Sequence, residues 1–401
     1  MDLQQKFIWE VESGLLHNDF SLLTRRLMDF CEEFNISEIN KKEIFELRKT
    51  YLNSENKEGN PVLSNDIIDK TKSLINEFQK LNLTLKKQNP LSTELLISAN
   101  GISKQFVKGR SPFRLYPLDV KLRFGEITGV VGENGNGKTT LLRILSGELS
   151  SDTGSILYPA LSIKNNDWYM AKNHLGFIPQ RINKWHGTLL DNLRFYATIH
   201  NLKNEDNFYH IDYILFRLGL DKFRDLKWSE ISSGYRLRFE LAKMLLWKPK
   251  LLILDEPLAN LDINAQQLFL QDLKFFTQSI SHPVSVILSS QNLHEIERVA
   301  DNIIFIRQGK TIYNGSQVDF ALDRLQNSFE ISGKFDLDTL AKCFADFVEF
   351  KVENAGTSFI ITTSVGIDIY AVTNILKEKQ LDLTYIRDIS KSTRKLFHKD
   401  I

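Results

Sequence analysis

The sequence has few cysteines and no excess of either charge. Only two cysteines, Cys31 and Cys343, occur among 401 residues, and neither has another cysteine nearby. This spacing argues against a disulfide framework or a cysteine-based metal site and predicts two isolated, buried thiols. Lysine and arginine number 51 against 50 aspartates and glutamates, for a net charge of +1. Since nucleic-acid binding depends mainly on an excess of basic side chains, no nucleic-acid partner is expected.

Long apolar runs are also lacking. The N-terminal stretch MDLQQKFIWEVESG carries acidic residues and no apolar segment ending in small residues, so no signal peptide is predicted. Nowhere does the chain contain a run of about 18 apolar residues, the length that a membrane-spanning helix needs. The sequence therefore predicts a soluble, cytoplasmic protein, whose membrane role would have to come through a partner.

The first of three regions, residues 1–90, is expected to form a helical domain. Apolar side chains recur there at steps of three and four residues, with a break near Gly14 and Asn18. Its charged residues have the pattern of an ordinary solvated helix face. Its aromatic residues, Trp9 among them, are expected in the core. No spacing in this region indicates chemistry, so its role is left open. The apolar positions are Phe7, Val11, Leu15, Phe20, Leu23, Leu27, Phe30, Ile68, Ile75, Phe78 and Leu81.

Strands and helices alternate over residues 91–316. The segments ITGVVG, LLILDEP and VSVILSS are nearly continuous apolar runs, which are typical of a parallel sheet covered on both faces. Residues 317–401 instead show the order strand, helix, strand, strand, helix, strand, which predicts a small ferredoxin-like α/β domain.

A phosphate-binding loop is predicted within GVVGENGNGKTTLLRIL, between an apolar strand and an apolar-periodic helix. Its glycines allow close backbone approach, so that the loop amides face phosphate oxygens. Lys138 is expected to reach the outer phosphates and the Thr139 hydroxyl to ligate Mg²⁺, which makes ATP and Mg²⁺ the expected cofactors. The predicted phosphate-binding residues are Gly132, Glu133, Asn134, Gly135, Asn136, Gly137, Lys138, Thr139 and Thr140.

Two acidic residues follow the apolar strand of LLILDEPLANLD. The exit of a buried strand is an unfavourable place for carboxylates without a role. Asp255 is therefore expected to hold Mg²⁺ through water, and Glu256 to polarise the attacking water.

A second anion-binding helix start is predicted in ISSGYRLRFELAKMLL, residues 231–246. A polar Ser-Ser-Gly stretch precedes a helical run, so free backbone amides and the positive end of the helix dipole would face an anion. One chain thus carries two phosphate-binding helix starts.

The combined motifs resemble the nucleotide-binding subunit of ATP-binding-cassette (ABC) transporters, from about Leu95 to Gly315. ISSGYRLRFELAKML is similar to the family's signature motif, GFIPQ to its Q-loop with Gln180, and LANLD to its D-loop ending at Asp262. Phe106 takes the place of the aromatic residue that stacks on adenine. The resemblance implies an α/β P-loop NTPase (RecA-like) cassette with a helical subdomain inserted at about residues 181–228.

The resemblance also implies a head-to-tail dimer. Each signature helix, with Ser232, Ser233 and Gly234, would cap the γ-phosphate that a second copy holds, and Gln180 would link the Mg²⁺ to a membrane partner. The sequence departs from the family pattern at three positions. Ser233 replaces a glycine, Tyr235 replaces a glutamine, and Gln291 stands where the family usually has its switch histidine. Glutamine can donate a hydrogen bond but cannot become cationic, so slow hydrolysis is expected. His294 is read as a surface helix residue.

Three functions remain open at this point. The first is the ATPase subunit of an exporter, peripheral on the inner face of the membrane and bound to integral permease subunits. The segment 187–202 resembles the corresponding segment of drug- and ion-exporter cassettes, and the C-terminal domain resembles an accessory domain that some of them carry. The alternatives are a soluble ABC ATPase acting on ribosomes or DNA, and a regulatory clamp in which ATP binding matters more than turnover. The transported substance, and whether the dimer pairs identical chains, cannot be read from the sequence.

Overall fold

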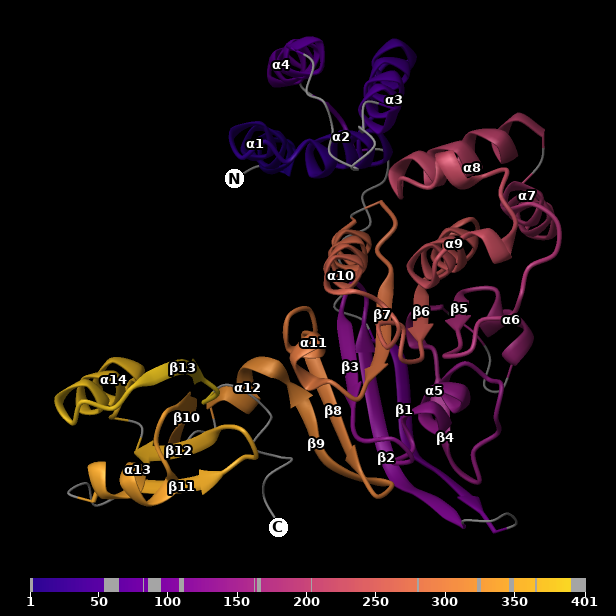
Figure 1. Ribbon diagram of the computed structural model, residues 1–401. Coiled ribbons are helices and arrows are strands. Elements are labelled where there is room, and N and C mark those ends of the chain that lie inside the picture. The colour runs from indigo at the N-terminus through magenta and orange to yellow at the C-terminus, as the bar shows by residue number, and fades with distance from the viewer. Residues whose placement is uncertain are drawn as a thin grey trace.

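The computed structural model describes three parts along the chain (Figure 1). N-terminal helices lie at one end, beside helices of a central α/β unit, and a small α/β unit lies on the side of strands β8 and β9. The description covers residues 3–53, 65–81, 83–85, 95–107, 112–161, 163, 167–202, 204–279, 281–322, 326–345, 350–364 and 366–390. Residues 391–401, which include most of the DISKSTRKLF stretch, lie outside it.

Four helices form the N-terminal part and enclose a core of their own. Phenylalanine rings dominate this core, with the ring centroid of Phe30 lying 4.5 Å from that of Phe34 and 4.7 Å from that of Phe78. The break near Asn18 is confirmed, because the Asp19 side chain accepts a hydrogen bond from the Leu22 amide and starts a new helix. Trp9 is 57% exposed, so its assignment to the core was wrong. The helices are α1 (Leu3–Leu16), α2 (Phe20–Glu33), α3 (Glu38–Asn53) and α4 (Asn65–Lys80).

A six-stranded sheet forms the middle of the central part, in the order β5-β6-β7-β3-β8-β9. All neighbouring pairs are parallel except β8 and β9, and every residue of β3, β6 and β7 is buried, as the apolar runs predicted. A separate antiparallel sheet has the order β2-β1-β4. The strands are β1 (Leu95–Phe106), β2 (Phe113–Arg123), β3 (Ile127–Val131), β4 (Thr153–Leu157), β5 (Leu175–Ile178), β6 (Leu251–Leu254), β7 (Ser285–Ser290), β8 (Asn302–Arg307) and β9 (Lys310–Ser316).

Helices on the two faces of this sheet carry the predicted motifs. The segment between β5 and β6 holds α7, α8 and α9, of which α7 and α8 form the inserted helical region. The helices are α5 (Lys138–Leu145), α6 (Trp168–Lys172), α7 (Leu189–Ile199), α8 (Asn204–Arg217), α9 (Ser233–Leu245), α10 (Ile263–Thr277), α11 (Leu293–Glu297) and α12 (Gln317–Leu322). Among the described helices, none combines the length and apolar character needed to cross a membrane.

The C-terminal part has the ferredoxin-like arrangement that the sequence predicted. Its sheet has the order β11-β12-β10-β13 with antiparallel neighbours, and two helices connect the strands. Cys343 is buried in this part and Cys31 in the N-terminal part, as the expectation of two isolated, buried thiols had it. The elements are β10 (Gln326–Gly333), α13 (Leu337–Cys343), β11 (Phe350–Asn354), β12 (Phe359–Ser364), α14 (Ile369–Glu378) and β13 (Leu383–Asp388).

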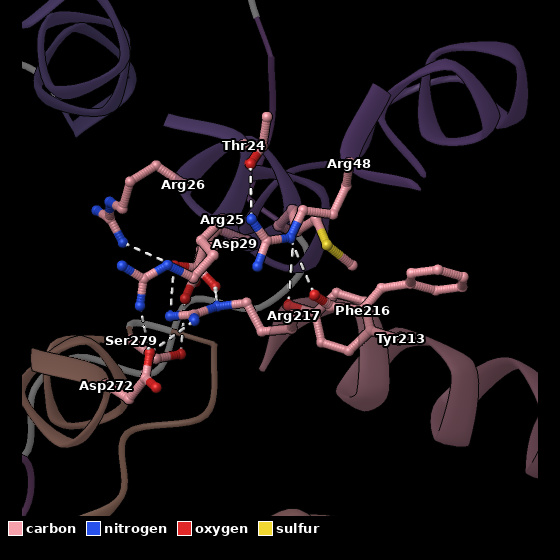
Figure 2. A network of polar contacts seen from close by, with 12 residues as sticks. Thr24, Arg25, Arg26, Asp29, Arg48, Tyr213, Phe216, Arg217, Asp272 and Ser279 are labelled. Carbon is pink, nitrogen blue, oxygen red and sulfur yellow. Dashed lines mark hydrogen bonds and ion pairs between the residues drawn. The ribbon is translucent and has the colours of Figure 1, made fainter. Parts of the chain in front are cut away.

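Charged side chains are buried where the N-terminal helices meet the central part, which the sequence interpretation missed (Figure 2). Arg25, on α2, forms an ion pair of 2.8 Å with Asp272, on α10. Arg217, at the end of α8, pairs with the same carboxylate at 2.9 Å and with Asp29 of α2 at 2.6 Å. Arg48 donates to the backbone oxygen of Phe216 at 3.0 Å. The expectation of a solvated charge face was therefore wrong for these side chains, because their partners lie on distant parts of the chain.

Candidate functional site

The phosphate loop joins the carboxyl end of β3 to the start of α5, as its strand and helix context predicted. Gly132 packs directly beneath the neighbouring strand, and a Cβ atom there would lie 2.3 Å from the backbone oxygen of Ile306. Gly137 has φ of +106°, a conformation that side chains disfavour, and its added Cβ would meet the Phe113 ring at 2.7 Å. Both glycines are therefore required by the fold of the loop itself.

Lys138 lies at the centre of a buried polar cluster. Its ammonium group donates to the backbone oxygen of Gly132 at 2.7 Å and forms an ion pair of 3.0 Å with Glu256. The Gln180 side-chain amide donates to the other oxygen of Glu256 at 3.0 Å. The structure thus brings together the predicted phosphate-binding lysine, the predicted general base and the Q-loop glutamine, although they lie far apart in the sequence.

Ser289 contacts both acidic residues, the carboxylate of Asp255 and the backbone of Glu256, and the sequence interpretation did not single it out. Its hydroxyl donates to Asp255 at 2.8 Å and accepts from the Glu256 amide, also at 2.8 Å. The only sequence signal for it is that two serines follow the apolar residues Val286, Ile287 and Leu288 at the end of β7. Glu256 has φ of +46°, which is uncommon for a residue with a side chain and costs about 1–3 kcal/mol. Such strain concentrates at functional sites, where the surrounding contacts impose it.

The oxygen donors at this edge of the sheet fit Mg²⁺ with ATP. Mg²⁺ in nucleotide sites takes one or two protein oxygens together with phosphate oxygens and waters. The Thr139 hydroxyl, the Asp255 carboxylate and the Gln180 amide oxygen are donors of this hard-oxygen type. No group of three or more His, Cys, Asp or Glu side chains arranged for a metal occurs in the part of the chain that the structure describes. A magnesium ion here would consequently depend on the phosphates as well as the protein.

The remaining residues of the loop lie at the surface or support its backbone. Glu133, Asn134, Gly135 and Thr139 are exposed, and Thr140 is half-buried. Asn136 is buried and accepts a hydrogen bond from the Gln308 amide at 2.7 Å, which ties the loop to the turn after β8. Phe106, at the end of β1, is 37% exposed and therefore accessible for stacking.

The signature helix, α9 with its cap Ser232, begins beside the D-loop rather than the phosphate loop. The Ser232 side chain accepts from the Tyr235 amide and caps α9. The Ser233 hydroxyl donates to the backbone oxygen of Asn260 at 2.9 Å. The side chain that replaces the family's glycine is therefore bound within its own subunit. Tyr235 packs against Phe223, with ring centroids 4.1 Å apart.

Gly234 has no intramolecular reason to be glycine. A Cβ atom there would lie 3.6 Å from Ala265 and Leu261, which is ordinary van der Waals contact. Among the described contacts, no hydrogen bond or ion pair links Ser232, Ser233 or Gly234 to the phosphate loop of the same chain. The two phosphate-binding helix starts are thus separate within one chain.

Asp262 and Gln291 occupy loop positions outside the buried cluster. The Asp262 carboxylate accepts from the Ala265 amide at 2.9 Å and caps α10. Gln291 is exposed in the turn after β7. Ser290 and Asn292 fix this turn through hydrogen bonds to Glu295 of 2.8 and 3.2 Å. The side chain of His294 lies outside the described residues, so its reading as a surface residue stays a prediction.

Comparisons with known proteins agree with these motifs. The sequence profile of the family described as "ABC transporter" matches residues 115–259. An uncharacterized ABC transporter ATP-binding protein of Methanocaldococcus jannaschii is 30% identical over 196 residues, which cover 49% of this chain and 69% of that protein. A molybdenum import ATP-binding protein of Saccharophagus degradans is 29% identical over 223 residues, covering 55% of this chain and 60% of that protein.

Comparison of the fold with solved structures leads to the same family. The structure of cbiO1 from Clostridium perfringens, part of the ABC transporter complex cbiONQ, matches 57% of this chain and 91% of that chain, with a TM-score of 0.51 and 22% identity. That likeness shows that the central part has the P-loop NTPase fold of an ABC cassette, with the N- and C-terminal parts as additions. On its motifs, its fold and these relatives, the chain belongs to the family of ABC transporter ATP-binding proteins.

Proposed function

We propose that this protein binds and hydrolyses ATP as the nucleotide-binding subunit of an ABC exporter. Two copies, or this chain and a related cassette, would face each other head to tail around two ATP molecules. The protein would lie on the inner face of the membrane and drive separate permease subunits. The contacts of the buried Lys138–Glu256 pair with the exposed Gln180 carry this proposal.

The geometry of the cluster supports a hydrolytic role. When ATP binds, the Lys138 ammonium group would leave the Glu256 carboxylate and contact phosphate oxygens instead. The Glu256 carboxylate would then be available to orient an attacking water. Ser289 keeps Asp255 and the Glu256 backbone at a fixed separation during this exchange. Mg²⁺, when bound, neutralises the charge that develops on the phosphates. Gln180 contacts Glu256 and lies at the start of the segment leading to α7, so it connects the catalytic carboxylate to the helical region.

Two observations support a composite pocket. The signature residues lie apart from their own phosphate loop, and the absence of crowding at Gly234 points to a constraint from outside the chain. Moving a two-state equilibrium from mostly open to mostly closed requires about 5.5 kcal/mol. Hydrogen bonds to charged groups contribute about 1.5–3 kcal/mol each, so two such bonds at each of two γ-phosphates are sufficient. ATP would therefore close the pair, and hydrolysis would release it.

A groove beside Gln180 is suited to a membrane subunit. It has a volume of about 370 Å³, and both Pro179 and Ile182 line it. Phe195, on α7, also lines the groove and is 63% exposed. Because an exposed aromatic side chain at a groove commonly anchors a protein partner, we assign this surface to the permease subunit. The Gln180–Glu256 contact would relay movement between the groove and the ATP site.

The outward direction of transport rests on the sequence. Segment 187–202 forms the loop and α7 beside the groove, and it resembles the exporter cassettes, as does the C-terminal domain. The names of the relatives do not decide the direction: one is a molybdenum import protein, and a probable multidrug ABC transporter ATP-binding protein, YbhF, of Escherichia coli, which is 29% identical, has no direction in its name.

Replacing Glu256 with glutamine is expected to lower steady-state ATP hydrolysis by about a hundredfold or more, since the side chain keeps its size but loses its charge. The same variant should form a stable dimer with ATP, detectable by size-exclusion chromatography with light scattering. Glu353→Gln, in the C-terminal domain, is the matched control and should change neither property. A Glu256→Gln protein that hydrolyses ATP at the normal rate, or stays monomeric with ATP at high concentration, would contradict the proposal.

Gly234→Ala is expected to separate folding from function. The added methyl group fits within the chain, and alanine favours helices by up to about 1 kcal/mol over glycine, so thermal stability should be kept or slightly raised. Hydrolysis should fall by about tenfold or more, because the methyl group would displace the phosphate of the second copy. Calorimetry and an ATPase assay test both parts. Unchanged hydrolysis would show that no phosphate approaches this residue.

Gln291→His should preserve or raise turnover, because histidine can donate the same hydrogen bond and can also become cationic. Gln291→Ala removes the donor and should lower turnover below that of the natural protein. Steady-state rates of the two variants, measured side by side, test the assignment. A collapse in the histidine variant would mean that the site is built around the amide.

Phe195→Glu is expected to reduce association with membranes that contain the permease, because a charge would enter the apolar contact. Trp9→Glu is the matched control, since Trp9 is 57% exposed on α1, away from the groove. Sedimentation with membranes from cells that co-express the permease provides the measurement. If the two variants sediment with these membranes to the same extent, the groove is not the docking surface.

A further inference from the structure

The buried carboxylate of Asp272 connects the N-terminal helices to the signature helix. One of its oxygens accepts from Arg25 at 2.8 Å and from Arg217 at 2.9 Å. Its other oxygen faces Arg238, on α9, at 3.8 Å. Burial opposes ionisation of Asp272, but Arg217, Arg25 and Arg238 outweigh it and hold the pKa below its ordinary value. The carboxylate is therefore charged, and three helices of the central part and the N-terminal domain converge on it.

Arg25 links the N-terminal domain to this carboxylate with high geometric specificity. Its guanidinium group also donates to the Gln271 side chain at 3.1 Å, so it contacts two adjacent residues of α10. A planar guanidinium group fixes such a pair of acceptors better than an ammonium group does. Arg25 thus sets, together with Arg217, which way the Asp272 carboxylate faces.

The contact between Asp272 and Arg238 is incomplete. In the described part of the chain, the second oxygen of Asp272 and the Nε atom of Arg238 are buried without a hydrogen-bond partner. Arg238 instead donates to the backbone oxygen of Leu218, at the end of α8. The contact of Asp272 with Arg238, at 3.8 Å, is therefore longer than its contacts with Arg25 and Arg217, at 2.8 and 2.9 Å. A pocket of about 120 Å³ lies beside the junction and is lined by Asp29 and Arg217 among others.

Helices α9 and α10, which the contact between Arg238 and Asp272 joins, both begin at the proposed interface between copies. Arg238 follows Ser232 by six residues, or about 9 Å along α9, and Asp272 follows Asp262 by ten residues, or about 15 Å along α10. The Ser233–Asn260 hydrogen bond joins the two helix starts. Helices of this length move as stiff bodies, so a change at the Arg238–Asp272 contact is transmitted to both starts.

We propose that Arg25 and Asp272 are positioning residues for the signature helix, through which the N-terminal domain controls how Ser232 is presented to a second copy's ATP. This inference rests on the composite site proposed above and gives the N-terminal domain a role in it. Neither residue touches the nucleotide of its own chain. Loss of the Arg25 contact therefore affects the step between copies and not the binding of ATP to a single copy.

The test compares full-length Arg25→Met and Arg25→Lys with Asn40→Ala. Methionine removes the charge of Arg25 and keeps most of its apolar stem, whereas lysine keeps the charge and serves as the milder variant. Asn40 is a matched control, because its side chain donates to Glu77 at 2.8 Å within the N-terminal domain. Asn40→Ala thus weakens that domain without changing its contact with Asp272. Circular dichroism establishes that each variant is folded.

Hydrogen exchange of residues 232–246 is the first measurement, on single copies without nucleotide. Arg25→Met should speed exchange in the first turns of α9 about tenfold, Arg25→Lys should give a smaller effect, and Asn40→Ala should leave these residues unchanged. Equal exchange of α9 in Arg25→Met and the natural protein, or equal acceleration by Asn40→Ala, would overturn the inference.

ATP-dependent dimerisation in the Glu256→Gln background is the second measurement. Arg25→Met should raise the protein concentration needed for half-dimerisation about tenfold, while the affinity of single copies for a fluorescent ATP analogue stays unchanged. A loss of single-copy affinity equal to the loss of dimerisation would mean that Arg25 has only a structural role. If the Glu256→Gln protein itself does not dimerise with ATP, the composite site fails, and hydrogen exchange alone then decides the positioning role.

Discussion

The burial of Asp272 constrains how the helices of this protein meet. A carboxylate removed from water requires positive partners, and removing one partner of such a pair costs about 3–5 kcal/mol. Here the partners come from different elements, Arg25 from α2, Arg217 from α8 and Arg238 from α9. An apolar junction would tolerate sliding or rotation, whereas this one is satisfied in few arrangements. The charges thus restrict the orientations in which the N-terminal helices can pack on the central part.

The sequence predicted those parts of the site that depend on neighbouring residues. The phosphate loop was readable because its glycines, Lys138 and the flanking strand and helix lie within one short segment. Asp255 and Glu256 were readable because an apolar strand precedes them. The ferredoxin-like unit followed from the order of its elements alone. In each case the sequence signal that identifies a residue lies within a few positions of that residue.

Contacts between distant segments could not be predicted in this way. Arg25 lies 247 residues from Asp272, and nothing in the TRRLMDF stretch distinguishes a buried arginine from one on a solvated face. The same holds for Ser289, whose two partners lie on the neighbouring strand's exit. Trp9 shows the opposite failure, since an aromatic residue on a helix suggested burial although its side chain faces outward.

One chain carries two predicted phosphate-binding helix starts, and the packing around their glycines differs. At the phosphate loop, Gly132 and Gly137 are demanded by the chain's own backbone and side chains, so that loop is complete by itself. At the signature helix, Ser232 and Ser233 are bound within the subunit and Gly234 is uncrowded, and the composite site that we propose would place the remaining requirement for glycine on a second copy. Closing two copies requires about 5.5 kcal/mol. Removing one partner of a buried ion pair costs about 3–5 kcal/mol, which is of the same order. In our proposal, loss of the Arg25–Asp272 contact is therefore large enough to shift that equilibrium.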